Sequence, residues 1–240
     1  MKLENISIVL VGTTHPGNIG AAARAMHNMC FNRLVLVDPQ CAVGEVAYAR
    51  ASGANAVLDD RQTFTGLAQA IADCGCVIAT SARRRSLAWP ELSPEAMSQK
   101  LIDMGGSSRV ALVFGREHSG LTNEELQLCN YMLSIPANPE FSSLNLASAV
   151  QIVCYEIYRR QAIRPAAAVP DAQDLPASSA ETEGYFAQLQ QVLESNGFVN
   201  PEQPGLVMQR LRRLYLRSEP TRNEINILRG MLSAIERQRD

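Results

Sequence analysis

The chain has 240 residues, of which 46% are hydrophobic and 19% charged, and its formal net charge is -2. This composition excludes a largely disordered chain and a uniformly basic coat for nucleic acid, although it leaves room for a local basic surface. No apolar run approaches the roughly 20 residues of a membrane-spanning helix, and the N-terminus lacks the cleavage pattern of a signal peptide. We therefore expect a cytoplasmic protein that does not act at a membrane.

Five short apolar runs follow one another along the first part of the chain, at residues 6–12, 33–38, 76–80, 109–114 and 131–136. Continuous apolar runs of this length are typical of strands that are buried on both faces of a parallel sheet. Helical patterns lie at 19–29, after a capping box formed by Thr122 and Glu125, and at 145–160. The alternation predicts an α/β fold with a parallel sheet.

The composition changes near residue 164. Residues 164–180 contain three prolines and little periodicity, which predicts a linker between a first domain (1–163) and a helical extension (181–240). Arginines crowd the last two of the three helical patterns in this extension: Arg210, Arg212, Arg213, Arg217, Arg222 and Arg229. The arginine cluster is either a solvated helix surface or a contact surface for an RNA backbone, and its sequence favours neither.

Several common site patterns are absent from the sequence. The loop at 12–19 has the glycine spacing of a P-loop, but Asn18 and Ile19 stand where that loop needs a lysine and a hydroxyl residue, which excludes hydrolysis of nucleoside triphosphates. Neither a GxGxxG nor a GxSxG sequence occurs. The cysteines and histidines have no zinc-like spacing, so we expect free thiols and no metal requirement.

Three segments combine glycine or small residues with polar residues beside a predicted strand end. They are Gly17–Arg24, Leu112–Thr122 and Ile135–Leu146. Small residues allow another backbone or a ligand to approach closely. The three segments therefore indicate one concave site, with Arg24 on the helix that begins beside it.

Over about residues 5–158, in order and spacing, these segments resemble the three motifs of the SpoU/TrmH class of knotted SPOUT RNA ribose 2′-O-methyltransferases. The residues that match are Asn18, Gly20 and Arg24; Phe114, Gly115, Glu117 and Gly120; and Ile135, Pro136, Ser143, Leu144 and Asn145. The resemblance is strongest to one branch of this class, which methylates nucleotide 32 of the tRNA anticodon loop, at cytidine or uridine. The segments that resemble this branch are residues 80–83, Trp89–Pro90 and 137–145.

The resemblance implies a deep trefoil knot, S-adenosyl-L-methionine as cofactor, the tRNA anticodon stem-loop as substrate and a homodimer. The cofactor-binding residues that it implies are Thr80, Ser81, Ala82, Gly115, Ile135, Ser142, Ser143 and Leu144. It makes Arg24 the central catalytic residue, reaching toward the cofactor of the partner subunit. Asn18, Ser143 and Asn145 are expected to order Arg24 and the ribose.

Two questions stay open at this point. Arg24 either accepts the proton of the ribose hydroxyl or clamps a phosphate while another group accepts that proton, because a guanidinium keeps its proton up to about pH 12. The alternative substrate is ribosomal RNA, since the motifs do not distinguish it from tRNA. A non-catalytic RNA-binding protein is a third reading, against which the presence of Asn18, Arg24, Glu117 and Asn145 counts.

Overall fold

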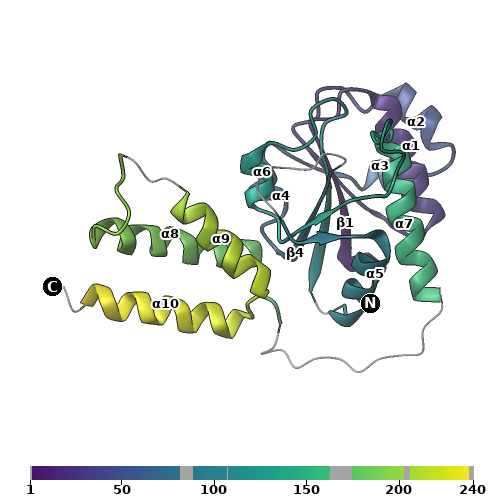
Figure 1. Ribbon diagram of the computed structural model, residues 1–240. Coiled ribbons are helices and arrows are strands. Elements are labelled where there is room, and N and C mark those ends of the chain that lie inside the picture. The colour runs from purple at the N-terminus through teal and green to yellow at the C-terminus, as the bar shows by residue number, and fades with distance from the viewer. Residues whose placement is uncertain (1, 82–88, 107, 163–174, 203–205, 238–240) are drawn as a thin grey trace.

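The structure is a computed structural model that describes residues 2–81, 89–106, 108–162, 175–202 and 206–237. Figure 1 shows an α/β domain followed by a helical extension that lies to one side of it. None of the helices in these ranges is long and apolar enough to cross a membrane.

The α/β domain is built on one sheet, and all its strand pairs are parallel. Its strands are β1 (Ile6–Val11), β2 (Arg33–Val37), β3 (Gln62–Phe64), β4 (Cys74–Thr80), β5 (Glu91–Leu92), β6 (Arg109–Phe114) and β7 (Tyr131–Leu133). Their order across the sheet is β3-β2-β1-β6-β4-β7-β5. All five strands predicted from apolar runs are present, which confirms the α/β fold with a parallel sheet.

The central strands are buried on both faces because their residues alternate between two apolar cores. In β1 all six residues are buried; Ile8 and Leu10 face one core, and Val9 and Val11 face the other. The edge strands β3 and β5 were missed by the sequence-based prediction. They are only three and two residues long, and none of their residues is fully buried. For this reason they contain no apolar run from which a strand could be predicted.

Helices cover both faces of the sheet (Figure 1). Those that pack around the larger core are α1 (Pro16–Asn28), α2 (Glu45–Ala51), α3 (Asn55–Asp59), α5 (Pro94–Asp103) and α7 (Leu146–Ala162). The helices α4 (Leu67–Ala70) and α6 (Asn123–Gln127) supply apolar residues to the other core. Thr122 and Glu125 form the predicted capping box at the start of α6, with both reciprocal hydrogen bonds present.

Helix α1 begins three residues earlier than the sequence pattern predicts. Pro16 occupies its first turn, and His15 Nδ1 accepts a hydrogen bond from Gly17 N at 3.0 Å, which caps the helix. Asn18 therefore lies in the first turn of α1 rather than in the loop before it. From this position the side chain of Asn18 reaches the carboxyl edge of the sheet, where it contacts Glu117 in the turn after β6.

The extension consists of α8 (Ser179–Ser195), α9 (Val207–Ser218) and α10 (Arg222–Arg237) around an apolar core of its own. Tyr185, Phe186 and Tyr215 pack as an aromatic group, with ring centroids 5.1–6.3 Å apart. Helix α8 starts before the predicted end of the linker because Ser178 and Glu181 form a capping box there.

The extension contacts the α/β domain of its own chain through polar groups. Lys100 Nζ on α5 donates to Glu219 Oε2 at 2.8 Å and lies 4.4 Å from the centroid of the Tyr131 ring on β7. Asn130 Nδ2 donates to the carbonyl oxygen of Leu216 at 3.4 Å. These contacts connect α9 directly to the strand that leads into the third sequence motif.

Two later strands enter the sheet between earlier ones: β6 lies between β1 and β4, and β7 lies between β4 and β5. The trefoil knot stays a prediction from the family, because the path of the chain includes residues 82–88, which lie outside the described ranges.

Candidate functional site

A cavity of about 190 Å³ lies at the carboxyl ends of the neighbouring strands β6, β4 and β7. Seven of the eight predicted cofactor-binding residues line it: Thr80, Ser81, Gly115, Ile135, Ser142, Ser143 and Leu144. The eighth, Ala82, lies outside the described residues. Segments that are far apart in the sequence thus meet at one site, as expected for the carboxyl edge of a parallel sheet.

Hydrogen bonds join the three strand ends that surround the cavity. Thr80 Oγ1 donates to the carbonyl oxygen of Val113 on β6 at 3.1 Å. The backbone N–H of Ser81 donates to the carbonyl oxygen of Leu133 on β7 at 3.0 Å. The hydroxyl of Thr80 therefore connects the end of β4 to β6 in the wall of the cavity.

The second motif folds into a tight turn that forms one wall of the cavity. Arg116 and Gly120 exchange backbone hydrogen bonds of 3.2 and 2.9 Å, and Gly120 has a φ of 70°. A Cβ atom on Gly115 would lie 2.3 Å from the carbonyl carbon of Gly120 and 2.5 Å from the nitrogen of Leu121. The glycine at 115 is thus required by the turn itself.

The lining of the cavity combines apolar and polar groups. Phe114, Leu133, Leu146 and Ala149 supply apolar surface, whereas the loop at 142–144 brings hydroxyl groups and backbone to the rim. Such a lining suits a ligand with a flat apolar ring and a polar edge. S-adenosylmethionine has both, so the residues present fit the cofactor that the sequence implies.

A hydrogen-bond network connects all three motifs beside the cavity. Asn18 Nδ2 donates to Glu117 Oε1 at 3.0 Å, and Asn145 Nδ2 donates to Asn18 Oδ1 at 3.0 Å. Thr14 donates to Glu117 Oε2 through its backbone N–H at 3.3 Å and its hydroxyl at 3.2 Å. Asn145 Oδ1 also caps α7 by accepting from Ala147 N at 3.0 Å. The network thereby ties α1, the second-motif turn and α7 to one another.

The Glu117 carboxyl is held in its charged form by this network. Burial by itself raises the pKa of that carboxyl, but hydrogen bonds from Asn18, its own backbone and Thr14 outweigh the burial and bring the pKa below its ordinary value. Both carboxylate oxygens are already engaged. Glu117 lines the cavity, yet its bonds make it a structural anchor between the first and second motifs.

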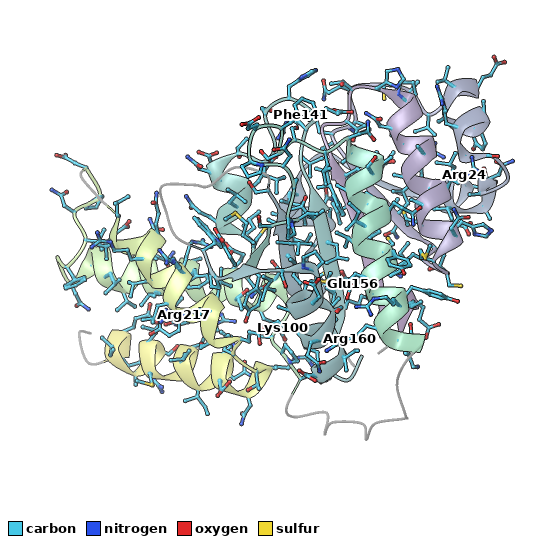
Figure 2. All side chains as sticks on the ribbon, turned by 45° about the vertical axis from the view of Figure 1, so that its right-hand side comes forward. Arg24, Lys100, Phe141, Glu156, Arg160 and Arg217 are labelled. Atoms are coloured by element: carbon cyan, nitrogen blue, oxygen red, sulfur yellow. The ribbon has the colours of Figure 1, made fainter. Side chains whose placement is uncertain are left out.

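The structure does not bring all four predicted catalytic residues together. Asn18 and Asn145 are hydrogen-bonded, and Ser143 lines the cavity. Arg24, however, does not line the cavity; it lies on the exposed side of α1 and forms no hydrogen bond or ion pair with any other described residue. Figure 2 shows Arg24 on α1, well apart from Phe141 in the loop that precedes α7. Helix periodicity explains this, because the flanking Ala23 and Ala25 are buried against the core.

Several lining residues were missed by the sequence-based prediction of the site. Arg116, His118 and Ser119 line the cavity in the second-motif turn. Arg116 pairs with Glu125 through two hydrogen bonds of 3.0 Å, which fixes the turn to the start of α6. The capping box at Thr122 located the helix start in the sequence, but nothing in it indicated that Glu125 also binds Arg116.

Comparisons with known proteins agree with the motif-based resemblance. A family model described as the SpoU rRNA methylase family matches residues 5–155, and a model described as the C-terminal domain of the tRNA methyltransferase TrmJ matches residues 180–240. The chain is 46% identical over 239 residues to the tRNA (cytidine/uridine-2′-O-)-methyltransferase TrmJ of Klebsiella pneumoniae, with 98% of each chain covered.

Two solved structures show how far the similarity extends. The crystal structure of TrmJ from Z. mobilis ZM4 matches with a TM-score of 0.83 and 35% identity, covering 96% of this chain and 98% of that one. A structure titled for 2′-OH methylation of C/U34 on tRNA matches with a TM-score of 0.51 and 27% identity, covering 66% of this chain and 97% of that chain. The predicted methyltransferase family is confirmed: the chain belongs to the SpoU methylase family and carries the C-terminal domain of TrmJ behind its α/β domain.

Proposed function

We propose that the protein transfers a methyl group from S-adenosyl-L-methionine to the ribose 2′-oxygen of nucleotide 32 in the tRNA anticodon loop, at cytidine or uridine. The observation that carries this proposal is the cavity at the ends of β6, β4 and β7, where seven of the cofactor-binding residues that the resemblance implies meet. The full-length relatives named as tRNA (cytidine/uridine-2′-O-)-methyltransferases support the substrate class.

The extension supports tRNA over a smaller substrate, because some of its arginines are not used in ion pairs within the extension and are left to contact an RNA backbone. Its arginines fall into two groups in this respect. Arg212 and Arg222 are engaged in ion pairs with Glu183 and Glu181. Arg210, Arg213 and Arg217 recur at helical spacing on α9, and their side chains form no hydrogen bond or ion pair within the described part of the chain. These three are the arginines that we assign to the RNA backbone.

We also propose that the active unit is a homodimer formed through α7 and the adjoining α1. The outer side of α7 exposes Ile152, Tyr155 and Tyr158, at 36%, 51% and 39% of their surface, a row of apolar groups that is typical of a covered interface. Helices α1 and α7 pack side by side. An interface on this side would bring Arg24 close to the cavity of the partner subunit.

Different residues of the site orient the methyl group, fix the spacing of the motifs and bind the phosphate of the substrate. When bound, S-adenosylmethionine supplies a methyl group activated by a positively charged sulfur. The cavity walls orient that group, and the network of Asn18, Glu117 and Asn145 holds the motifs at a fixed spacing. The 2′-hydroxyl must lose its proton, which an oxygen of the neighbouring phosphate or a water molecule would accept. We assign to Arg24 the binding of that phosphate, since a guanidinium does not release its own proton near neutral pH.

The test of this function is the mapping of 2′-O-methyl groups on tRNA from a strain that lacks the gene, with and without the gene restored. Restoration should return the methyl group at nucleotide 32. Purified protein should then methylate tRNA but not ribosomal RNA fragments when S-adenosylmethionine is present. A methyl group that appears only at nucleotide 34, or only on ribosomal RNA, would overturn the proposed substrate.

The variant Arg24→Ala tests the assigned mechanism. It should lower methylation by about a hundredfold or more, the scale of the loss when a reacting group is misplaced, while calorimetry finds the affinity for S-adenosylmethionine unchanged. Full methylation by this variant would contradict the role of Arg24.

A further inference from the structure

Phe141 is the most exposed of the large apolar side chains in the described part of the chain. It has 78% of its surface in contact with solvent, compared with 36% for Leu144 in the same loop. An aromatic side chain so fully exposed loses the stabilisation that burial would provide. No folding role within the described residues explains an aromatic group at this position.

The loop presents Phe141 in a fixed way. Asn138 Oδ1 accepts a hydrogen bond from Glu140 N at 3.0 Å, and the Asn138 carbonyl oxygen accepts from Phe141 N at 2.9 Å. Pro136 and Pro139 restrict the backbone on either side of Asn138. The backbone that carries the ring is restricted in this way, so it has little conformational freedom to lose when a partner binds.

Phe141 stands at the rim of the site. The residues that follow it directly, Ser142 and Ser143, line the cavity. Figure 2 shows Phe141 at the end of the molecule where α7 begins, beside the carboxyl edge of the sheet. A group bound to the Phe141 ring would thus be a near neighbour of anything that enters the cavity.

We infer that Phe141 is a stacking platform for an unpaired base of the RNA loop, which holds the target ribose at the mouth of the cavity. This inference rests on the proposed function, because it takes RNA as the substrate. Single-stranded bases in RNA loops are commonly stacked on aromatic side chains. The neighbouring Glu140 carries a negative charge that repels phosphate, so the face of a base fits this position and the RNA backbone does not.

Three variants separate stacking from a general apolar contact. Phe141→Ala should lower kcat/KM for tRNA by at least about fivefold, the lower end of the effect of losing one base-aromatic stack. Phe141→Tyr should keep the activity of the wild type, because it keeps the ring. Phe141→Leu, which is apolar but has no ring, should lose activity as Phe141→Ala does. Calorimetry should find the affinity for S-adenosylmethionine unchanged in all three. The matched control is Phe198→Ala, since Phe198 is also exposed, at 68%, but lies in the extension.

A binding measurement makes the inference independent of catalysis. Wild-type protein and Phe141→Ala are titrated with anticodon stem-loop RNAs, each of which lacks one base of the loop. At one loop position, removing the base should weaken binding by wild-type protein but cause no further loss in Phe141→Ala, which is the signature of a direct contact. If the wild type binds the loop but methylates nothing, the proposed function fails while this comparison still decides the role of Phe141.

Three results would overturn the inference. One is wild-type activity in Phe141→Ala or in Phe141→Leu. Another is the absence of any loop position whose effect depends on Phe141. The third is dissociation of a dimer by Phe141→Ala in sedimentation, which would show that a second copy of the chain covers the ring.

Discussion

At the scale of single residues, Glu117 and Asn18 together connect the three motifs of the site. Glu117 accepts hydrogen bonds from Asn18 in the first motif and from Thr14 in the loop before α1, and Asn18 in turn accepts one from Asn145 in the third motif. The energy of such a network depends on the charge of its central carboxylate, since hydrogen bonds to charged groups are stronger than neutral ones. The charge of Glu117 therefore links the stability of the site to pH.

We expect Glu117→Gln to lower the free energy of unfolding by about 1 kcal/mol at pH 7, because the amide loses the charge and points a donor at Thr14 or Asn18. The pKa of Glu117 is lower in the folded chain than in the unfolded chain, so its stabilisation is complete above the unfolded value and disappears as the pH falls through the folded value. Urea unfolding from pH 7 down to pH 3 should therefore show the difference between variant and wild type shrinking in acid.

The matched control for Glu117 is Glu140→Gln, because Glu140 is exposed and its side chain has no hydrogen bond or ion pair to another described residue. That substitution should leave the unfolding curve close to wild type at every pH. A loss in Glu117→Gln that stays constant down to pH 3 would contradict the charge-dependent role of Glu117.

At the scale of elements, two contacts between helices and their neighbours depend on single residues: the close approach of α1 to α2 and the docking of α9 on α5 and β7. The first depends on Gly20, since a Cβ atom there would lie 2.0 Å from the carbonyl oxygen of Ala47. The sequence motif includes this glycine, and the structure shows that its space is taken by α2. Its place in the motif thus reflects helix packing beside the site.

Gly20→Ala should lower the free energy of unfolding by at least about 2 kcal/mol, because the backbones of α1 and α2 must separate. Gly230→Ala provides the control: Gly230 also lies within a helix, α10, but a Cβ atom there would meet nothing within 4 Å. That variant should gain about 0.5–1 kcal/mol from helix propensity. Urea denaturation measures both, and a stabilising Gly20→Ala would contradict the packing.

The contact between Lys100 and Glu219 should contribute to the docking of the extension, because both side chains are largely buried, with 23% and 26% of their surface exposed. Glu219 also adopts a left-handed backbone conformation at the end of α9, with a φ of 50°, which costs energy in a residue other than glycine. We expect a double-mutant cycle of Lys100→Met and Glu219→Gln to give a coupling energy of about 1 kcal/mol.

The comparison pair for that cycle is Lys2–Glu4, which is 3.6 Å apart with 70% and 66% of the side chains exposed. Exposed pairs of this kind contribute little, so Lys2→Met and Glu4→Gln should be additive. Small-angle scattering should also report a larger radius of gyration for Lys100→Met. Additive effects at Lys100 and Glu219 would show that other contacts dock the extension.

At the scale of the whole molecule, the separation of Arg24 from the cavity is the main reason to expect that the site is completed by a second chain. Mixed dimers test this directly. Arg24→Ala is combined in equal amounts with Ala149→Phe, a variant intended to fill the cavity, after calorimetry has shown that Ala149→Phe no longer binds S-adenosylmethionine.

Each variant alone should be inactive, but the mixture should recover about a quarter of wild-type activity. Half of the dimers are mixed, and each mixed dimer has one site with both an intact cavity and an intact Arg24 from its partner. Methyl transfer to tRNA after subunit exchange measures the recovery. An inactive mixture, with subunit exchange confirmed by sedimentation of tagged chains, would place Arg24 in the site of its own chain.

Much of the architecture was predictable because it depends on local patterns. The apolar runs of β1, β2, β4, β6 and β7 mark strands that are buried on both faces, and the capping box at Thr122 marks a helix start. The short strands β3 and β5 were not predictable, because their pairing with β2 and β7 comes from position in the sheet and not from their own residues.

The sequence by itself determined the family, the parallel α/β fold and seven of the residues that meet around the cavity, because motifs and apolar runs are properties of neighbouring residues in the chain. Only the tertiary structure decided that Asn18 joins Glu117 to Asn145 and so connects the three motifs, that Gly20 makes room for α2, and that Arg24 lies apart from the cavity. These features depend on distances between segments that are far apart in the chain, and such distances are set by packing.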